Sequence, residues 1–144
     1  MIYEIKDEKD PYSRYVLEDP VRAHIPMAER FGPNRHVFAL LENDTISAVV
    51  CSKLCCGVPA SEQSLLSNNC ANSNTIVFYT IWSYRPGAGQ KLIAEGLKLA
   101  KSKFSNVDQF VTLSPPTEMA RRFHLKNGAT VYRVNEDTVN YEYK

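Results

Sequence analysis

The spacing of apolar and polar residues predicts short strands and one helix in the first third of the chain. Residues 2–6 alternate between apolar and polar side chains, as a half-buried strand does. Apolar runs at residues 36–42 and 46–54 flank the turn sequence Asn43-Asp44, so we expect a hairpin there. Earlier, Asp19-Pro20 has the form of a helix cap followed by a first-turn proline. Apolar residues then recur at helical spacing, which predicts an α-helix over residues 19–31.

The second half of the chain is a succession of strands and helices. Residues 75–83 are β-branched and aromatic, so we expect a buried strand. A Gly-rich turn follows, and the apolar residues from Leu92 to Phe104 share one side of a helix. Four further elements complete the order β-α-β-β-β-α-β-α-β-β: a strand at 107–114, a helix at 117–126 and a closing pair of strands at 130–134 and 138–143.

The composition is that of one soluble globular domain. The chain has 144 residues, of which 44% are hydrophobic and 23% charged. A formal net charge of +1 gives no support to nucleic-acid binding through bulk charge. No apolar run approaches the roughly 18 residues of a membrane span, and the N-terminus has no secretory signal. We therefore expect a cytoplasmic protein that engages neither a membrane nor a nucleic acid.

The cysteines cluster in the middle of the chain, with the spacing C-x3-C-C-x13-C over residues 51–70. Zinc sites need paired cysteines or histidines, which this stretch lacks, so we expect no metal. In a cytoplasmic protein the thiols are expected to be reduced, with Cys51 in the core of a strand and Cys55, Cys56 and Cys70 on a loop. Residues 57–74 are rich in Ser, Asn and Ala and predict a long surface loop containing a short helical turn. Whether that loop is functional or merely mobile stays open.

The turn after the strand at 75–83 has the composition of an anion-binding site. Glycines allow backbone N–H groups to approach a phosphate, and the helix N-terminus adds about half a positive charge. The predicted cradle consists of Arg85, Gly87, Ala88, Gly89, Gln90 and Lys91. The sequence lacks the Gly-Lys-Ser/Thr of a Walker loop and the third glycine of the dinucleotide fingerprint. A tight strand-to-helix turn without a ligand is the structural alternative.

The element order resembles the GNAT fold, whose members bind the pyrophosphate of coenzyme A at this turn. A GNAT turn usually begins with Gln or Arg three residues before its first glycine. Here Tyr84 holds that place and Arg85 follows it. The resemblance implies an α+β fold in which helices flank a central mixed, mostly antiparallel sheet, and one acyl-CoA-binding domain over residues 1–144.

A second resemblance covers roughly residues 27–144. The run Phe123-His124-Leu125-Lys126-Asn127-Gly128-Ala129 and the tetrapeptide Thr112-Leu113-Ser114-Pro115 are similar to the C-terminal part of malonyl-CoA decarboxylases. Weaker likenesses occur at 30–35, 78–81, 132–135 and 140–143. The catalytic domain of that family has a GNAT-like fold, so the two resemblances agree. The likeness does not extend to the family's N-terminal helical domain, and the helical insertion between the two main motifs is reduced to residues 116–122.

The decarboxylase resemblance implies roles for individual residues. Ser114 and His124 take the positions of the catalytic serine and histidine, and Arg85 to Lys91 that of the CoA-binding turn. Loss of CO2 from malonyl-CoA leaves a thioester enolate, whose oxygen must be stabilised and whose carbon must be protonated. Ser114 is expected to hold the carboxylate or thioester, and His124, which ordinarily titrates near neutrality, to donate the proton. The backbone N–H groups of Ile81, Trp82 and Ser83 are expected to bind the thioester oxygen, and Tyr141 to act in positioning.

Two other functions remain open from the sequence. One is an N-acetyltransferase that moves an acetyl group from acetyl-CoA to an amine, with residues 55–74 and the acidic pair Glu136-Asp137 shaping the acceptor site. The other is a CoA-binding module without catalysis, in which Ser114 is a strand terminus and His124 a structural side chain. A homodimer formed through strands at the end of the sheet is a further hypothesis.

Overall fold

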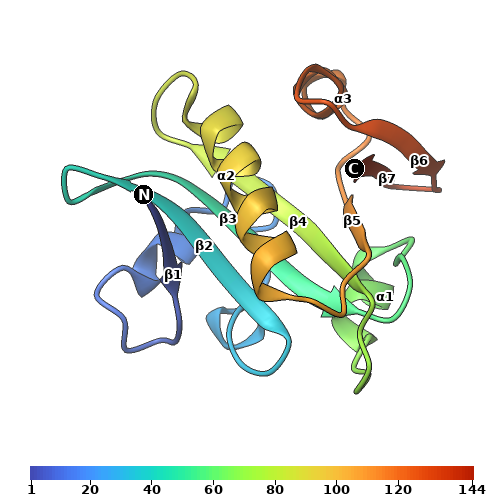
Figure 1. The fold of residues 1–144 in the computed structure, drawn as a ribbon, viewed down its shortest axis with the longest axis horizontal. Coiled ribbons are helices and arrows are strands. Elements are labelled where there is room, and N and C mark those ends of the chain that lie inside the picture. The colour runs from blue at the N-terminus through green and yellow to red at the C-terminus, as the bar shows by residue number, and fades with distance from the viewer.

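The computed structural model describes all 144 residues, which form a seven-stranded sheet with the order β1-β2-β3-β4-β5-β7-β6 (Figure 1). Only β4 and β5 run parallel, and every other neighbouring pair is antiparallel. This arrangement confirms the expected α+β class with a mixed, mostly antiparallel sheet. The strands are β1 Ile2–Ile5, β2 Arg35–Glu42, β3 Thr45–Cys55, β4 Thr75–Ser83, β5 Gln109–Thr112, β6 Thr130–Val134 and β7 Val139–Tyr143.

Three α-helices accompany the sheet: α1 Glu62–Ser67, α2 Ala88–Lys103 and α3 Glu118–Lys126. The long helix α2 crosses one face of the sheet, and α3 lies beside the β6–β7 hairpin (Figure 1). Thr117 caps α3 by accepting the N–H of Ala120, and Gly128 follows the helix end with a φ of 98°. All three helical segments were expected from the sequence. None of them combines the length and the apolarity that a membrane crossing requires.

The predicted helix over residues 19–31 is wrong. The N-terminal segment forms two 3₁₀ turns, Ser13–Glu18 and Met27–Glu29, joined by irregular chain. Asp19 does accept the N–H groups of two following residues, at 2.8 and 2.9 Å, as a capping side chain would. The turn does not propagate, because Pro26 has no N–H to donate and its ring obstructs the preceding turn of a helix. The local cap signal was therefore correct and the extension of the helix was not.

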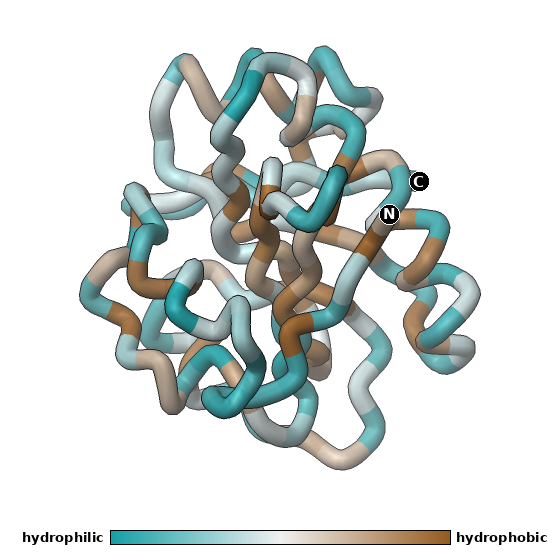
Figure 2. Tube along the Cα trace, turned by 90° about the vertical axis from the view of Figure 1, so that its left-hand side faces the viewer, coloured by the Kyte–Doolittle hydropathy of each residue, from teal (hydrophilic) through white to brown (hydrophobic).

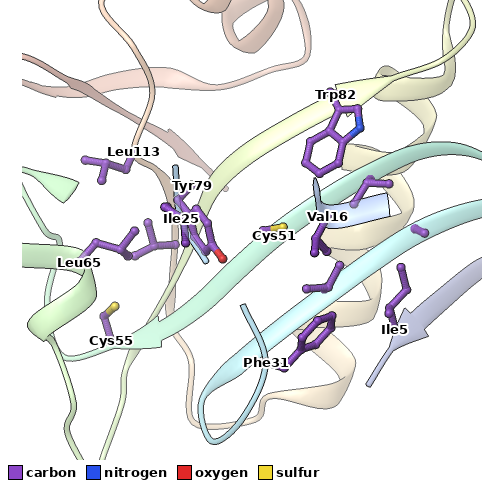
Figure 3. Packing of buried hydrophobic residues seen from close by; sticks show 14 of the residues in the cluster. Ile5, Val16, Ile25, Phe31, Cys51, Cys55, Leu65, Tyr79, Trp82 and Leu113 are labelled. Atoms are coloured by element: carbon purple, nitrogen blue, oxygen red, sulfur yellow. The ribbon is translucent and has the colours of Figure 1, made fainter. Parts of the chain in front are cut away.

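Two apolar cores lie on opposite faces of the sheet. Alternate residues of β4 supply them, Val77 and Tyr79 to one core and Ile76 and Phe78 to the other. The second core packs beneath α2, whereas the first is covered by the N-terminal segment and α1 (Figure 3). Hydrophobic segments accordingly concentrate in the middle of the molecule, and hydrophilic segments in its outer turns (Figure 2).

The cysteines differ from expectation in two respects. Cys51 is buried within β3, as predicted, but Cys55 is the last residue of that strand and is also buried, not on a loop. Cys56 and Cys70 form a disulfide across the loop, contrary to the expected reduced state. The loop folds back on itself and brings their Cα atoms within 6.1 Å, a separation that a disulfide spans. The bridge encloses α1 and so ties the long loop to the end of β3.

Candidate active site

A wedge opens between β4 and β5. The two strands pair only from Thr75 to Phe78 of β4, after which β5 ends and β4 continues to Ser83 paired with β3 on its other edge only. Ser114, two residues beyond β5, pairs instead with Val139 of β7. The chain after β5 therefore turns away from β4, and the two strands separate at the level of Ser114.

A cavity of about 340 Å³ occupies this wedge. Its walls come from the N-terminal segment, the free part of β4, the start of α2, the chain after β5 and α3. The structure thus brings Ser114 and His124 to one cavity, together with Ile81, Trp82, Ser83 and Gly89 of the predicted cofactor site. The lining contains no Asp, Glu, Lys or Arg; its other members are Pro20, Val21, Phe78, Tyr79, Thr80, Pro115, Thr117, Met119, Ala120 and Phe123.

His124 is held from two sides in the last turn of α3. Its Nδ1 lies 2.6 Å from the hydroxyl of Tyr143, and its ring stacks on Tyr141 with centroids 5.1 Å apart. Only 4% of the residue is exposed, and this burial lowers the pKa of His124 to about 4. The imidazole is therefore neutral at pH 7, which differs from the near-neutral titration expected from the sequence.

Tyr143 is the hydrogen-bond partner that bears on the tautomer of His124. Burial raises the pKa of Tyr143 above its ordinary value, so the phenol keeps its proton and can donate it to Nδ1 in the tautomer that leaves this nitrogen unprotonated. A neutral imidazole that accepts at Nδ1 carries its own proton on Nε2. Sequence reasoning missed Tyr143 and named Tyr141. The two residues are separated by one position on β7 and hence share a face, which is the signal that could have identified both.

Tyr141 contacts His124 and does not line the cavity. It is 2% exposed, and its ring packs between the sheet and the imidazole. Tyr141 therefore contacts His124 and not a molecule in the cavity, and its positioning role stays a prediction.

Ser114 is fixed by its backbone and by its side chain. Its N–H and C=O both bond to Val139, each at 2.9 Å, and its Oγ donates to Oγ1 of Thr112 at 2.8 Å. Asn140 adds a second brace by donating to the carbonyls of Thr112 and Pro59, at 2.8 and 3.0 Å. The serine hydroxyl is thus presented to the cavity from a rigid position at the strand end.

The register of β3 and β4 decides which backbone N–H groups face the wedge. Tyr84 donates its N–H to Ser47 of the β3 side at 2.8 Å. Because N–H direction alternates along a strand, the N–H of Trp82 also points to β3, and those of Ile81 and Ser83 point to the open side. Trp82 contributes its ring to the cavity wall instead.

The predicted anion cradle has the backbone geometry of one. Gly87 adopts a φ of 82°, which favours glycine, and starts α2. The N–H groups of Gly87, Gly89 and Gln90 donate to no atom of the protein, whereas those of Ala88 and Lys91 bond to preceding carbonyls. At Gly89 an added Cβ would lie 3.3 Å from the Phe123 ring, so a glycine also allows α2 and α3 to approach. Three free donors at the N-terminus of a 16-residue helix can bind a phosphate.

The two basic side chains of the turn are already paired. Arg85 donates from Nε to Oε1 of Glu42 at 2.7 Å and from Nη2 to the same oxygen. Lys91 Nζ lies 3.3 Å from Oε2 of Glu42. Hydrogen bonds, chiefly from Arg85 and then from Ser47, lower the pKa of Glu42 to about 2, so the carboxylate is ionised across the physiological range. Sequence reasoning did not identify Glu42, which belongs to a strand far from the turn in the sequence.

Arg22 closes the wedge on the face opposite α2. It donates to the carbonyl of Tyr79 on β4 at 2.9 Å and to that of Leu113, after β5, at 2.8 Å. Its Nη1 pairs with Glu62 of α1 at 2.7 Å. A buried arginine therefore bridges the two diverging segments and links them to the disulfide-closed loop. The wrong helix prediction concealed this contact, because it placed Arg22 on a helix.

Known proteins resemble this chain in structure and not detectably in sequence. No protein-family model matches it, and no curated protein is similar to it in sequence. The malonyl-CoA decarboxylase from Agrobacterium vitis is similar over 100% of this chain and 60% of its own, with a TM-score of 0.81 and 18% identity. The malonyl-CoA decarboxylase from Cupriavidus metallidurans gives a TM-score of 0.76 at 18% identity, over 99% of this chain and 60% of its own. The chain thus spans about 60% of the length of these decarboxylases.

The GNAT domain of another protein is also similar in structure. The GNAT domain of S. lividans PAT has a TM-score of 0.68 and 14% identity, over 99% of this chain and 88% of its own. Structural similarity at identities this low establishes the fold but not the reaction. Together with the mixed sheet and its wedge, these likenesses identify the chain as a protein of the GNAT fold.

Proposed function

We propose that the protein is an acyl-CoA-dependent enzyme that converts malonyl-CoA to acetyl-CoA and CO2. The observation that carries the proposal is the meeting of Ser114 and His124 in one cavity that has no charged residue in its lining. This pair occupies the positions at which the sequence resembles malonyl-CoA decarboxylases.

The substrate is placed by the turn and by the open edge of β4. The free N–H groups of Gly87, Gly89 and Gln90 support binding of the CoA pyrophosphate at the start of α2. From there the pantetheine arm follows the wedge, so that the thioester oxygen reaches the N–H groups of Ile81 and Ser83.

An uncharged cavity favours loss of CO2. The malonyl carboxylate carries a localised charge, whereas the enolate spreads this charge over oxygen and carbon. Exclusion of water without a compensating cation therefore destabilises the reactant more than the transition state. The hydroxyl of Ser114 orients the carboxylate by turning its proton from Thr112 Oγ1 to a carboxylate oxygen. The bond between the carboxyl carbon and the α-carbon breaks, and its electron pair becomes the enolate that the backbone N–H groups stabilise.

His124 then protonates the α-carbon. A thioester enolate is basic enough to take the proton from Nε2 of a neutral imidazole, and the Tyr143 hydroxyl replaces that proton by donating to Nδ1. A solvent proton taken up at Nε2, with return of the Nδ1 proton to the tyrosine, restores both side chains. The overall reaction consumes one proton and releases acetyl-CoA and CO2, with no further reactant.

Acyl transfer to an amine is the second candidate. A neutral His124 favours it in the tautomer that carries the proton on Nδ1, because a general base needs an unprotonated nitrogen to accept the proton of the amine. The cavity lining opposes it, since no carboxylate is present to attract an ammonium group. We therefore rank acyl transfer below decarboxylation.

Mass spectrometry of malonyl-CoA incubated with purified protein tests the proposal. We expect conversion to acetyl-CoA that is lost in His124→Ala and retained in His24→Ala, since His24 is 64% exposed and lies outside the cavity. Malonyl-CoA that binds and remains intact would refute decarboxylation. A panel of amines with acetyl-CoA then tests acyl transfer, and no turnover with either thioester indicates a CoA-binding module without catalysis.

A further inference from the structure

The carboxylate of Glu42 is the feature of this surface that the proposed reaction does not use. Glu42 ends β2, beside the turn into β3, and reaches the start of α2 from a different part of the sheet. Its oxygens accept from both basic side chains of the Gly-rich turn, Arg85 at 2.7 Å and Lys91 at 3.3 Å. The remaining contact of the guanidinium, from Nη1, is with the carbonyl of Pro86 at 3.1 Å.

These contacts change what the turn offers to a phosphate. Two cations beside a helix N-terminus would make a strong anion site, but one carboxylate neutralises half of their charge and takes their best donors. The backbone N–H groups of Gly87, Gly89 and Gln90 stay free, so the turn can still accept an anion through its main chain. Arg85 and Lys91 can bind the same anion only by leaving Glu42.

We infer that Glu42 is an affinity- and specificity-determining residue that competes with the phosphates of CoA for Arg85 and Lys91. The inference rests on the proposed use of this turn for CoA. It concerns the nucleotide end of the ligand only, because pantetheine lacks the phosphates that Glu42 opposes. Glu42 thereby weakens the binding of CoA thioesters and leaves that of pantetheine thioesters unchanged, so the difference between the two affinities becomes smaller. Weaker binding also speeds release of CoA after turnover.

The test is calorimetric titration of wild type and Glu42→Gln with CoA and, separately, with pantetheine. The substitution keeps the size of the side chain and removes its charge. Because two solvent-accessible ion pairs are weakened, we expect CoA to bind about three- to tenfold more tightly and pantetheine to bind unchanged. Glu4→Gln is the matched control, because Glu4 also accepts from two basic side chains, Lys103 and His36. Lys103 lies at the end of α2 that is remote from the Gly-rich turn. The CoA affinity of Glu4→Gln should equal that of wild type.

The outcomes separate the inference from the proposed function. Unchanged or weaker CoA binding by a folded Glu42→Gln variant overturns the inference, because Glu42 then holds Arg85 in place rather than competing for it. An equal gain for pantetheine overturns it as well. If neither wild type nor the variant binds CoA, the proposed function fails and the inference fails with it. Unfolding of each variant by circular dichroism confirms that the compared proteins are folded.

Discussion

The burial of His124 makes the stability of the protein depend on pH in a defined way. The folded protein holds the pKa of this side chain at about 4, whereas the unfolded chain restores its ordinary value of 6.5. The unfolded state therefore binds a proton between these values that the folded state does not, and stability falls as the pH is lowered from 6.5 towards 4. The difference corresponds to ~3 kcal/mol of unfolding free energy, present in full above pH 6.5 and lost by pH 4.

Urea unfolding at a series of pH values from 4 to 7.5 measures this dependence. Because other ionisable groups also contribute to the pH dependence of unfolding, the informative quantity is the difference between wild type and His124→Gln. Glutamine preserves a hydrogen-bonding side chain and cannot gain the proton, so the stability advantage of wild type should shrink with falling pH. Parallel curves for the two proteins would falsify the conclusion that His124 is buried in its neutral form.

Two further predictions concern Tyr143 and the disulfide, neither of which was expected from the sequence. Tyr143→Phe removes the donor to Nδ1 of His124 and frees the other tautomer, so we expect kcat for decarboxylation to fall by about 10- to 100-fold with KM nearly unchanged. An equal loss in Tyr141→Phe, whose hydroxyl does not contact the imidazole, would contradict a specific role for Tyr143. Opening the disulfide with Cys56→Ser releases a loop whose ends are 14 positions apart, and denaturant unfolding should show a loss of ~3 kcal/mol. Indifference of the unfolding midpoint to a reductant would show that the bridge does not form in solution.

The sequence predicted correctly those helices and strands that are determined by neighbouring residues. The helix α2 follows from a sustained apolar stripe, α3 from a capping threonine and a terminal glycine, and β4 from its β-branched and aromatic composition. The prediction that Ser114 and His124 share a site came from resemblance to a family. In the structure both residues line the cavity between β4 and β5. Periodicity alone would have left both residues as a strand terminus and a helix histidine.

Contacts between distant segments were not accessible from the sequence. Arg22 and Arg30 are buried because carbonyls, Asp19 and Glu62 compensate their charge, and those partners come together only in the folded chain. The same limit applies to Glu42, whose partners Arg85 and Lys91 lie 43 and 49 positions away. The disulfide likewise depends on how a loop of low periodicity folds back, which composition does not determine.

The exchange of partners at Ser114 has a consequence for the order in which the molecule is built. The strands β1 to β4 and the helix α2 can associate before the later strands are made, because they pack against one another. Ser114 acquires its backbone partner, and His124 its hydrogen-bond partner, only from β7, which enters the sheet between β5 and β6 and is the last of the seven strands in chain order. A nascent chain therefore acquires most of its sheet before it can hold the two side chains of the cavity in place.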